Sequence, residues 1–153
     1  MNILIVFETY SNGTQTAVDV VSDVLKQHGH QVTMKKARET DPVEFQTPGT
    51  IILASPSWLV DGKDGQPHEF MKAFLQKATT VDLTGKYCAV FGLGDSTYAR
   101  FTGAVDHLVE FVETHHGKLI VEPLRVDEFY FHQERNETLL KQWAETLHQA
   151  LQK

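Results

Sequence analysis

Short apolar segments alternate five times along this chain with segments of helical periodicity. A continuous apolar run such as residues 50–54 is typical of a strand covered on both faces, whereas apolar residues at steps of three and four are typical of a helix with one buried face. Alternation of this kind predicts an α/β fold, a doubly wound five-stranded parallel sheet flanked by helices on both faces. The expected strands are residues 3–7, 31–36, 50–54, 86–91 and 118–121.

Four expected helices each present one apolar stripe. The stripes consist of Val18, Val21 and Leu25; Phe70, Phe74 and Ala78; Val105, Leu108, Val109 and Val112; and Leu140, Trp143, Ala144, Leu147 and Leu151. Between the second and third strands, Asp41 followed by Pro42 predicts a short capped helical turn. Residues 55–67 follow the third strand without either periodicity, and we expect a loop there.

Length and charge limit the class of protein. The 153 residues suit a single domain spanning 1–153, with one good core. The net charge of −6 argues against nucleic acid and anionic membranes as partners and allows a basic protein surface. We find no signal peptide and no segment for membrane insertion. The one cysteine, Cys88, lies in an apolar run, so we expect a buried thiol in a cytoplasmic protein.

Residues 7–16 join the first strand to the first helix through a loop rich in Thr, Ser, Asn and Gly. Backbone N–H groups and hydroxyls at a helix N-terminus make an anion site. The first basic residue is Lys26, so neutral donors alone would hold a phosphate here. Gln15-Thr16 replace the Lys-Ser or Lys-Thr of nucleotide-hydrolysing loops, and the three spaced glycines of dinucleotide loops are absent. The same residue types are ordinary helix caps, so this loop alone leaves both interpretations open.

Two further loops are expected at the same edge of the sheet. Ligands of doubly wound sheets bind beyond the carboxyl ends of the strands, where the strand order reverses. The loop after the third strand contains Trp58, and the loop after the fourth contains Asp95 and Tyr98. An anion site and two aromatic side chains at one edge suit a flat aromatic ring with a phosphate tail.

The chain resembles the flavodoxins over essentially its whole length. In that family the first loop reads Ser/Thr-x-Thr/Ser-Gly-x-Thr and holds the phosphate of FMN without positive charge. Thr9, Ser11 and Thr14 match this pattern, while Asn12 replaces the usual glycine. Asparagine tolerates left-handed backbone well, so the loop can survive the exchange. The most specific match is the third loop, with Phe91, Gly92, Gly94, Asp95, Ser96, Tyr98, Phe101, Gly103, Ala104, Val105 and Asp106.

This resemblance implies a short-chain flavodoxin with FMN as cofactor and the strand order 2-1-3-4-5. Tyr98 would stack on one face of the isoalloxazine ring, Trp58 would cover the other face, and backbone near residues 93–95 would bond the pyrimidine edge. No catalytic residue and no metal ligand are expected. The expected cofactor-binding residues are Thr9, Tyr10, Ser11, Asn12, Gly13, Thr14, Ser55, Pro56, Ser57, Trp58, Asp61, Gly62, Leu93, Gly94, Asp95, Tyr98 and Phe101.

Several of these residues also have a simpler interpretation. Tyr98 could be a surface aromatic, Trp58 a hydrophobic lid without stacking, and Asp95 a cap for the turn at Ser96. Ser55 and Ser57 are interpreted as polar loop groups near the ring. Glu8 is interpreted as a polar residue at a strand end.

The loop after the third strand, which contains Trp58, departs from the family pattern. Family members often have Gly-Asp after the tryptophan, where a peptide turns over to accept the N5–H of the half-reduced flavin. Here Leu59-Val60 follow Trp58, and Asp61-Gly62 come next. Either Asp61-Gly62 serve instead, or the half-reduced flavin is less stabilised than usual.

The function implied is that of a monomeric electron carrier without its own substrate. It would shuttle single electrons at low potential between redox partner proteins, a reductase donor and an oxidoreductase acceptor, whose basic surfaces would meet acidic residues around the flavin. One alternative is a small FMN-dependent NAD(P)H/quinone oxidoreductase. A second is a flavin-free interaction module on the same fold. A signalling receiver domain needs an aspartate after the third strand and a lysine after the fifth, where this chain has Ser55 and Pro123 or Leu124.

Overall fold

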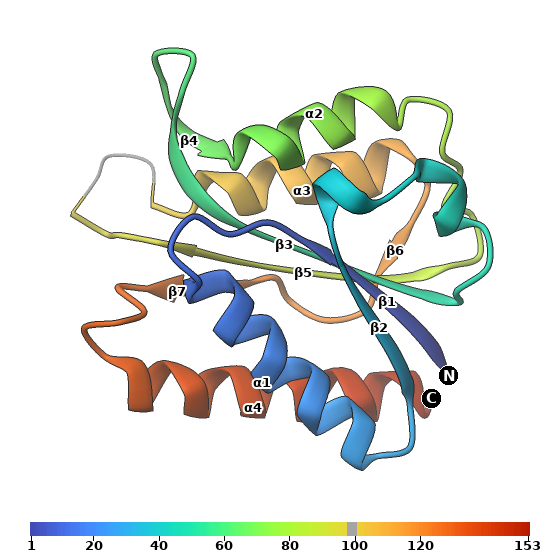
Figure 1. The fold of residues 1–153 in the computed structure, drawn as a ribbon. Coiled ribbons are helices and arrows are strands. Elements are labelled where there is room, and N and C mark those ends of the chain that lie inside the picture. Colours follow the sequence, from blue (N-terminus) through green and yellow to red (C-terminus); the bar gives the residue numbers. More distant parts are fainter. Residues whose placement is uncertain (98–100) are drawn as a thin grey trace.

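The computed structural model describes residues 1–97 and 101–153 (Figure 1). Its strands are β1 (Asn2–Phe7), β2 (Gln31–Lys36), β3 (Thr50–Val60), β4 (Lys63–Pro67), β5 (Tyr87–Gly94), β6 (Lys118–Leu119) and β7 (Leu124–Asp127). Its helices are α1 (Gly13–Gln27), α2 (Glu69–Lys77), α3 (Gly103–Thr114) and α4 (Gln133–Leu151), with two 3₁₀ turns, η1 (Ala37–Glu39) and η2 (Pro42–Phe45). None of the helices within these described ranges has the length and apolar character needed to cross a membrane.

The central sheet is parallel and has the order β2-β1-β3-β5-β6. This arrangement confirms the expected α/β fold and strand order 2-1-3-4-5, with β5 as the fourth strand. The fifth strand is shorter than predicted and is divided into β6 and β7, which pair with opposite ends of β5. Pro123 lies in the interruption and has no N–H to donate to a ladder.

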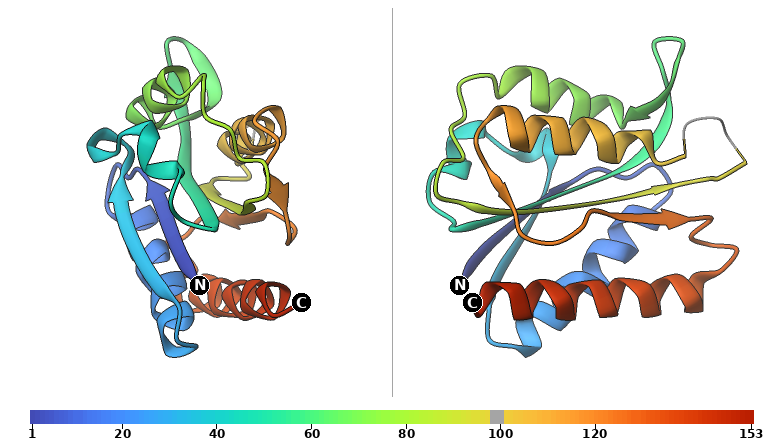
Figure 2. Two further views of the ribbon diagram at one scale, coloured as in Figure 1. Left: turned by 90° about the vertical axis from the view of Figure 1, so that its right-hand side faces the viewer. Right: turned by 180° about the vertical axis from the view of Figure 1, so that it is seen from behind.

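Two apolar layers cover the sheet, one on each face. Figure 2 shows α1 and α4 on one side and α2 and α3 on the other. Successive residues of a strand point to opposite faces, so β1 contributes Ile3 and Ile5 to the layer with α1 and α4, and Leu4 and Val6 to the layer with α2 and α3. Central strands buried on both sides explain the continuous apolar runs in the sequence.

The helix stripes are confirmed with one exception, in α2. Phe74 and Ala78 are buried, but Phe70 is 42% exposed and Met71 occupies the core position instead. Phe70 lies in the first turn of α2, where its ring packs against the Arg38 guanidinium at 4.3 Å. The helical turn predicted after Asp41 is present as the 3₁₀ turn η2, with Pro42 at its start and Asp41 as its cap.

The expected loop over residues 55–67 is instead a β-hairpin. β3 continues past the parallel sheet to Val60 and returns as antiparallel β4, with Val60 opposite Lys63 and Trp58 opposite Gln66. Asp61 and Gly62 form the two-residue turn, with φ of 53° and 75°. Positive φ at both positions is characteristic of a type I′ turn, for which Asp-Gly is a favoured pair. The hairpin projects beyond the end of α2 (Figure 1).

Candidate functional site

The first loop (residues 8–14) leaves the N-terminus of α1 without a side-chain cap. Asn12 adopts left-handed backbone with φ of 64°, as its place in the family pattern predicted, and its side chain makes no capping bond. The first turn of α1 contains no acidic residue. Because the first N–H groups of a helix have no partner within the helix, this end of α1 presents free donors and the positive end of the helix dipole.

Two buried hydroxyls in the same loop also lack partners. The Oγ1 atoms of Thr9 and Thr14 are buried and make no hydrogen bond to any part of the chain that the structure describes. A buried polar group without a partner costs about 1–3 kcal/mol, and a ligand that bonds both hydroxyls would remove this cost. Tyr10, Ser11 and Asn12 are exposed at the same turn. The loop thus has the donor set that a phosphate requires, and this is the fit expected for the phosphate of FMN.

Glu8, directly before these threonines, is a site feature that the sequence did not reveal. Its carboxylate is fully buried and accepts hydrogen bonds from the Arg38 backbone N–H at 2.9 Å and the Arg38 Nη2 at 2.8 Å. Glu8 follows the end of β1 as expected, and its carboxylate forms an ion pair with Arg38. The Glu8 carboxylate compensates the positive charge of Arg38 beside the loop. Anion binding by the loop therefore still depends on neutral donors.

An aromatic cluster connects the first loop to the hairpin. The Tyr10 and His68 rings stack with centroids 4.0 Å apart, and Tyr10 meets Trp58 at 5.4 Å with the planes tilted by 45°. Trp58 remains 57% exposed, whereas His68 is 3% exposed. Burial lowers the pKa of His68, which therefore stays neutral at pH 7 and accepts a hydrogen bond from Phe70 N–H through Nδ1. Sequence patterns gave no indication that His68 would support this loop.

Ser55 and Ser57 hold the base of the hairpin in place. The fully buried Ser55 hydroxyl donates to the Pro56 carbonyl and accepts from His68 N–H, each at 2.9 Å. The Ser57 hydroxyl accepts from Ala104 N–H at the start of α3, also at 2.9 Å. These bonds fix the base of the hairpin. They therefore position Trp58, which follows Ser57 on the way to the hairpin turn. Both hydroxyls thus bond within the protein, and the prediction that these serines lie near the ring stays a prediction.

The third loop (residues 95–102) begins where β5 ends. The Asp95 carboxylate accepts bonds from Thr97 N–H at 2.8 Å and the Thr97 hydroxyl at 2.7 Å, which is the capping interpretation of this residue. Leu93 is nearly buried at the end of β5, and Phe101 is half-buried. Tyr98, the residue expected to stack on the ring, lies outside the described residues.

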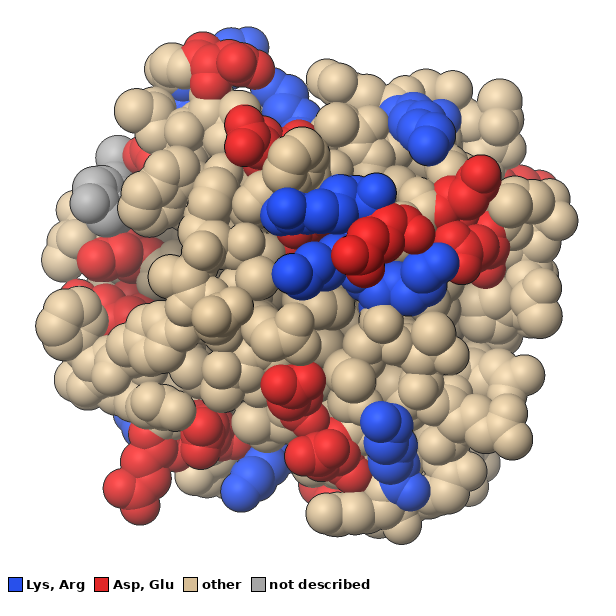
Figure 3. Space-filling view, viewed as in Figure 1, with Lys and Arg blue, Asp and Glu red and all other residues tan. Residues whose placement is uncertain are grey.

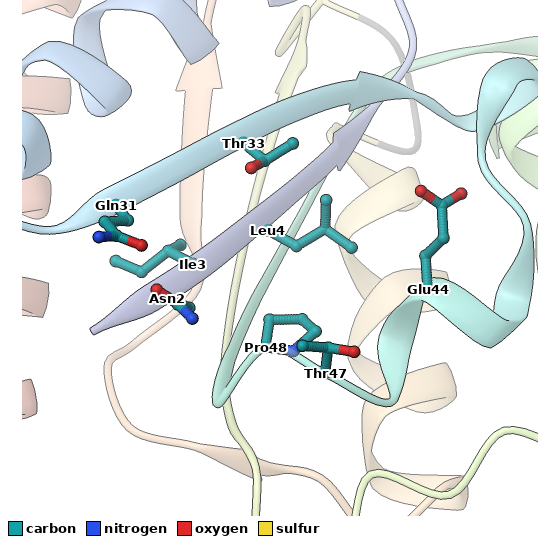
Figure 4. Close-up of a pocket in the computed structure, with 8 residues that line it drawn as sticks. All are labelled: Asn2, Ile3, Leu4, Gln31, Thr33, Glu44, Thr47 and Pro48. Atoms are coloured by element: carbon teal, nitrogen blue, oxygen red, sulfur yellow. The ribbon is translucent and has the colours of Figure 1, made fainter.

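A hollow of about 360 Å³ lies at the opposite end of the sheet (Figure 4). Glu44, a carboxylate in its lining, is paired with Lys35, and hydrogen bonds from Lys35 and the Asp41 N–H lower the pKa of Glu44. Ligands of parallel sheets bind at the carboxyl ends of strands, so we do not assign this hollow to the cofactor. It is lined by Asn2, Ile3, Leu4, Gln31, Thr33, Glu44, Thr47 and Pro48.

Over residues 1–97 and 101–153, no group of three or more His, Cys, Asp or Glu is arranged to hold a metal ion.

Fold and loops together define a mononucleotide-binding protein of the doubly wound α/β class. The uncapped α1, the hairpin with Trp58 and the third loop all lie at the carboxyl ends of β1, β3 and β5, on the left in Figure 1. These three strands are neighbours in the sheet, so the loops that follow them lie at one edge. The edge includes the point where the strand order reverses, next to β1.

Comparison with known proteins identifies the family. Residues 5–143 match the sequence profile of the flavodoxins. The chain is 29% identical to "Probable flavodoxin 2" of Bacillus subtilis over 126 residues, which are 82% of this chain and 81% of that protein. Oxidised flavodoxin 2 from Bacillus cereus superimposes with a TM-score of 0.88 at 26% identity, covering 97% and 99% of the two chains. Flavodoxin of Fusobacterium nucleatum bound to flavin mononucleotide has the same fold, with a TM-score of 0.83 at 20% identity over 97% of both chains.

The chain belongs to the flavodoxin family. As a member of this family it is an FMN-binding electron-transfer protein and not an enzyme with a substrate of its own. This assignment confirms the prediction made from the loop motifs over the oxidoreductase, receiver and flavin-free alternatives.

Proposed function

We propose that FMN lies across the carboxyl edge of the sheet, with its phosphate in the first loop and its ring between the hairpin and the third loop. The observation that carries this placement is the pair of buried, unpartnered hydroxyls of Thr9 and Thr14 beside the uncapped start of α1. In this arrangement the Thr9 and Thr14 hydroxyls and the first N–H groups of α1 donate to the phosphate.

Trp58 covers one face of the ring in this proposal, and Tyr98 covers the other. The hydrogen bonds of Ser55 and Ser57 fix the base of the hairpin and so the position of Trp58. Tyr10 packs beside the Trp58 ring. In this arrangement the backbone of Leu93, Gly94 and Asp95 bonds the pyrimidine edge of the ring. Aromatic cover on both faces excludes water from the ring.

FMN supplies reversible electron transfer when bound, and the surrounding carboxylates determine how readily negative charge develops on it. Asp61, Asp95, Asp127 and Glu128 all lie in or beside the hairpin and the third loop. Hydrogen bonds from the Ser96 side chain and backbone lower the pKa of Asp127, so it is ionised at neutral pH. Fixed negative charge near the ring disfavours its anionic reduced form, and we therefore propose a low potential for the second electron.

Charge at the same edge suggests the partner surface. Over the carboxyl ends of the strands, at the left of Figure 3, the charged side chains are mostly acidic. Lys63 in the hairpin reduces this acidity, while Lys72 is paired with Asp61 at 3.5 Å. We propose that a reductase donor and an oxidoreductase acceptor each present a basic surface to this edge. The carrier would work as a cytoplasmic monomer of one domain, in agreement with its one cysteine being a buried free thiol.

Equilibrium titration of the apoprotein with FMN and with riboflavin at low and high salt tests this placement. Neutral phosphate donors on a chain of charge −6 predict that FMN binds at least about tenfold more tightly than riboflavin and that salt does not weaken it. Equal affinity for the two flavins would mean that the first loop does not hold the phosphate. A marked loss of FMN affinity at high salt would point to a cation instead.

A further inference from the structure

The segment between β7 and α4 contacts both loops of the proposed site. At one end, the Asp127 carboxylate accepts from the Ser96 N–H at 2.9 Å and the Ser96 hydroxyl at 2.7 Å. Three residues later, the Tyr130 hydroxyl donates to the Ser11 carbonyl oxygen. Residues 127–130 therefore connect the third loop to the first loop, and we call this segment the brace.

Several contacts fix the brace to the core. The side-chain amide of Asn136, fully buried in α4, donates to the Asp127 carbonyl at 2.9 Å. Glu128 N–H donates to the Gly94 carbonyl at 2.9 Å, at the end of β5. Phe129 is 5% exposed and belongs to the apolar layer beneath α4. These contacts hold residues 127–129 against the core, while the Tyr130 side chain is 52% exposed and reaches the first loop from that fixed segment.

The Tyr130 ring also packs against the start of α1. A Cβ built on Gly13 would lie 3.4 Å from Cε2 of Tyr130 and 3.3 Å from Cδ2 of Leu93. Gly13 therefore fits between a side chain of β5 and the brace. This close approach accounts for a glycine at the first position of α1, where the backbone has ordinary negative φ.

The bond to Ser11 orients the peptide that joins it to Asn12. In a trans peptide the C=O and the N–H point in opposite directions. Because Tyr130 holds the Ser11 carbonyl on its own side, the Asn12 N–H points away from Tyr130. A carbonyl turned the other way would direct its negative end at a bound phosphate.

We propose that Tyr130 is a positioning residue for phosphate binding. It holds the Ser11–Asn12 peptide with the N–H available to the phosphate, while Asp127 holds the third loop near the ring. The brace in this way sets the spacing between the phosphate end and the ring end of the site, and favours a flavin mononucleotide over a flavin without phosphate. This inference rests on the proposed placement of FMN.

The test compares Tyr130→Phe with the matched control Tyr87→Phe, which alters a tyrosine at the other end of β5. Loss of one hydrogen bond predicts that Tyr130→Phe weakens FMN binding about 3- to 10-fold, while riboflavin binding stays within about twofold. The ³¹P resonance of bound FMN should also shift. In the apoprotein, the amide resonance of Asn12 should shift in Tyr130→Phe, because its peptide loses the hydrogen bond at the Ser11 carbonyl, and should stay unchanged in Tyr87→Phe.

Asp127→Asn separates the two ends of the brace. This substitution removes the ionised carboxylate that accepts hydrogen bonds from Ser96. It should weaken the binding of FMN and of riboflavin by the same factor and should not shift the ³¹P resonance of bound FMN. Equal losses for the two flavins in Tyr130→Phe, or no loss at all, would overturn the role of Tyr130. If the unaltered protein binds neither flavin, the placement of FMN itself fails. An unchanged Asn12 amide resonance in Tyr130→Phe would overturn the brace independently of any flavin.

Discussion

Thr9 and Thr14 show how a binding loop differs from a loop built only for stability. Their hydroxyls are buried without partners, and Asn12 leaves the helix uncapped, so the apoprotein carries groups that destabilise it. A phosphate would satisfy these groups together. Function at this loop therefore opposes the stability of the apoprotein, and substitution can separate the two effects.

Thr14→Val should stabilise the apoprotein by about 1 kcal/mol and weaken FMN binding at least about tenfold, because it replaces an unpartnered hydroxyl by a methyl group. Thr50→Val is the matched control, since the Thr50 hydroxyl is equally buried and unpartnered but lies at the opposite end of β3. It should stabilise the protein without changing FMN affinity. Urea unfolding and FMN titration of both variants measure these effects. A Thr14→Val protein that binds FMN normally would contradict the proposed phosphate site.

His68 links the stability of the site to pH. Burial lowers its pKa in the folded protein, whereas an unfolded histidine titrates near pH 6.5. Between these two pKa values the unfolded chain binds more protons than the folded chain. The free energy of unfolding is therefore fully retained above about pH 6.5 and falls as the pH drops through the folded pKa. Protonation also converts Nδ1 from the acceptor of Phe70 N–H into a donor.

His68→Phe should reduce this loss of stability at acid pH. The variant keeps an aromatic ring beside Tyr10 but loses the cap of α2, so it should be about 1 kcal/mol less stable at pH 7.5. Its stability should then change less between pH 7.5 and 5.5 than that of the unaltered protein. The unaltered protein serves as the control. Urea unfolding at three pH values measures both, and an unaltered pH dependence in His68→Phe would exclude His68 as its source.

At the scale of elements, the strands and helices that bury apolar residues were predictable, because burial leaves a period in the sequence. The hairpin of β3 and β4 was not predicted, since Ser55, Pro56 and the Lys63–Pro67 strand have little β-propensity and no apolar alternation. The Asp61-Gly62 pair was the available signal for a two-residue turn. Likewise, the Glu8–Arg38 ion pair joins residues far apart in sequence that come together only through the pairing of β1 with β2.

Gly62→Ala tests the turn of the hairpin. Gly62 has φ of 75° with no atom close to a new Cβ, so the substitution should cost about 1 kcal/mol through backbone conformation alone. Gly49→Ala is the control, because Gly49 is equally open but has no positive φ. It should be neutral or slightly stabilising, by about 0.5 kcal/mol. Thermal unfolding compares the two, and equal stability for both variants would contradict a type I′ turn at Asp61-Gly62.

At the scale of the molecule, one sheet edge collects the end of β1, the hairpin and the third loop, and the core behind them fixes their spacing. The order of the strands and the family motifs of the first and third loops could be predicted from the sequence. The contacts that support the loops could not be predicted from the sequence. His68, Tyr130 and Asn136 act through tertiary hydrogen bonds and stacking, which leave no period or motif in the sequence. The acidic edge remains a prediction about partners.

The most direct test of the central claim is an anaerobic reductive titration of the FMN-loaded protein, followed by visible absorption. An electron carrier of this kind should take up electrons in two separate one-electron steps, the second at lower potential, and should not oxidise NAD(P)H without a partner protein. A chain that cannot be loaded with FMN would contradict the claim. So would a loaded protein that accepts both electrons in a single step while it turns over NAD(P)H.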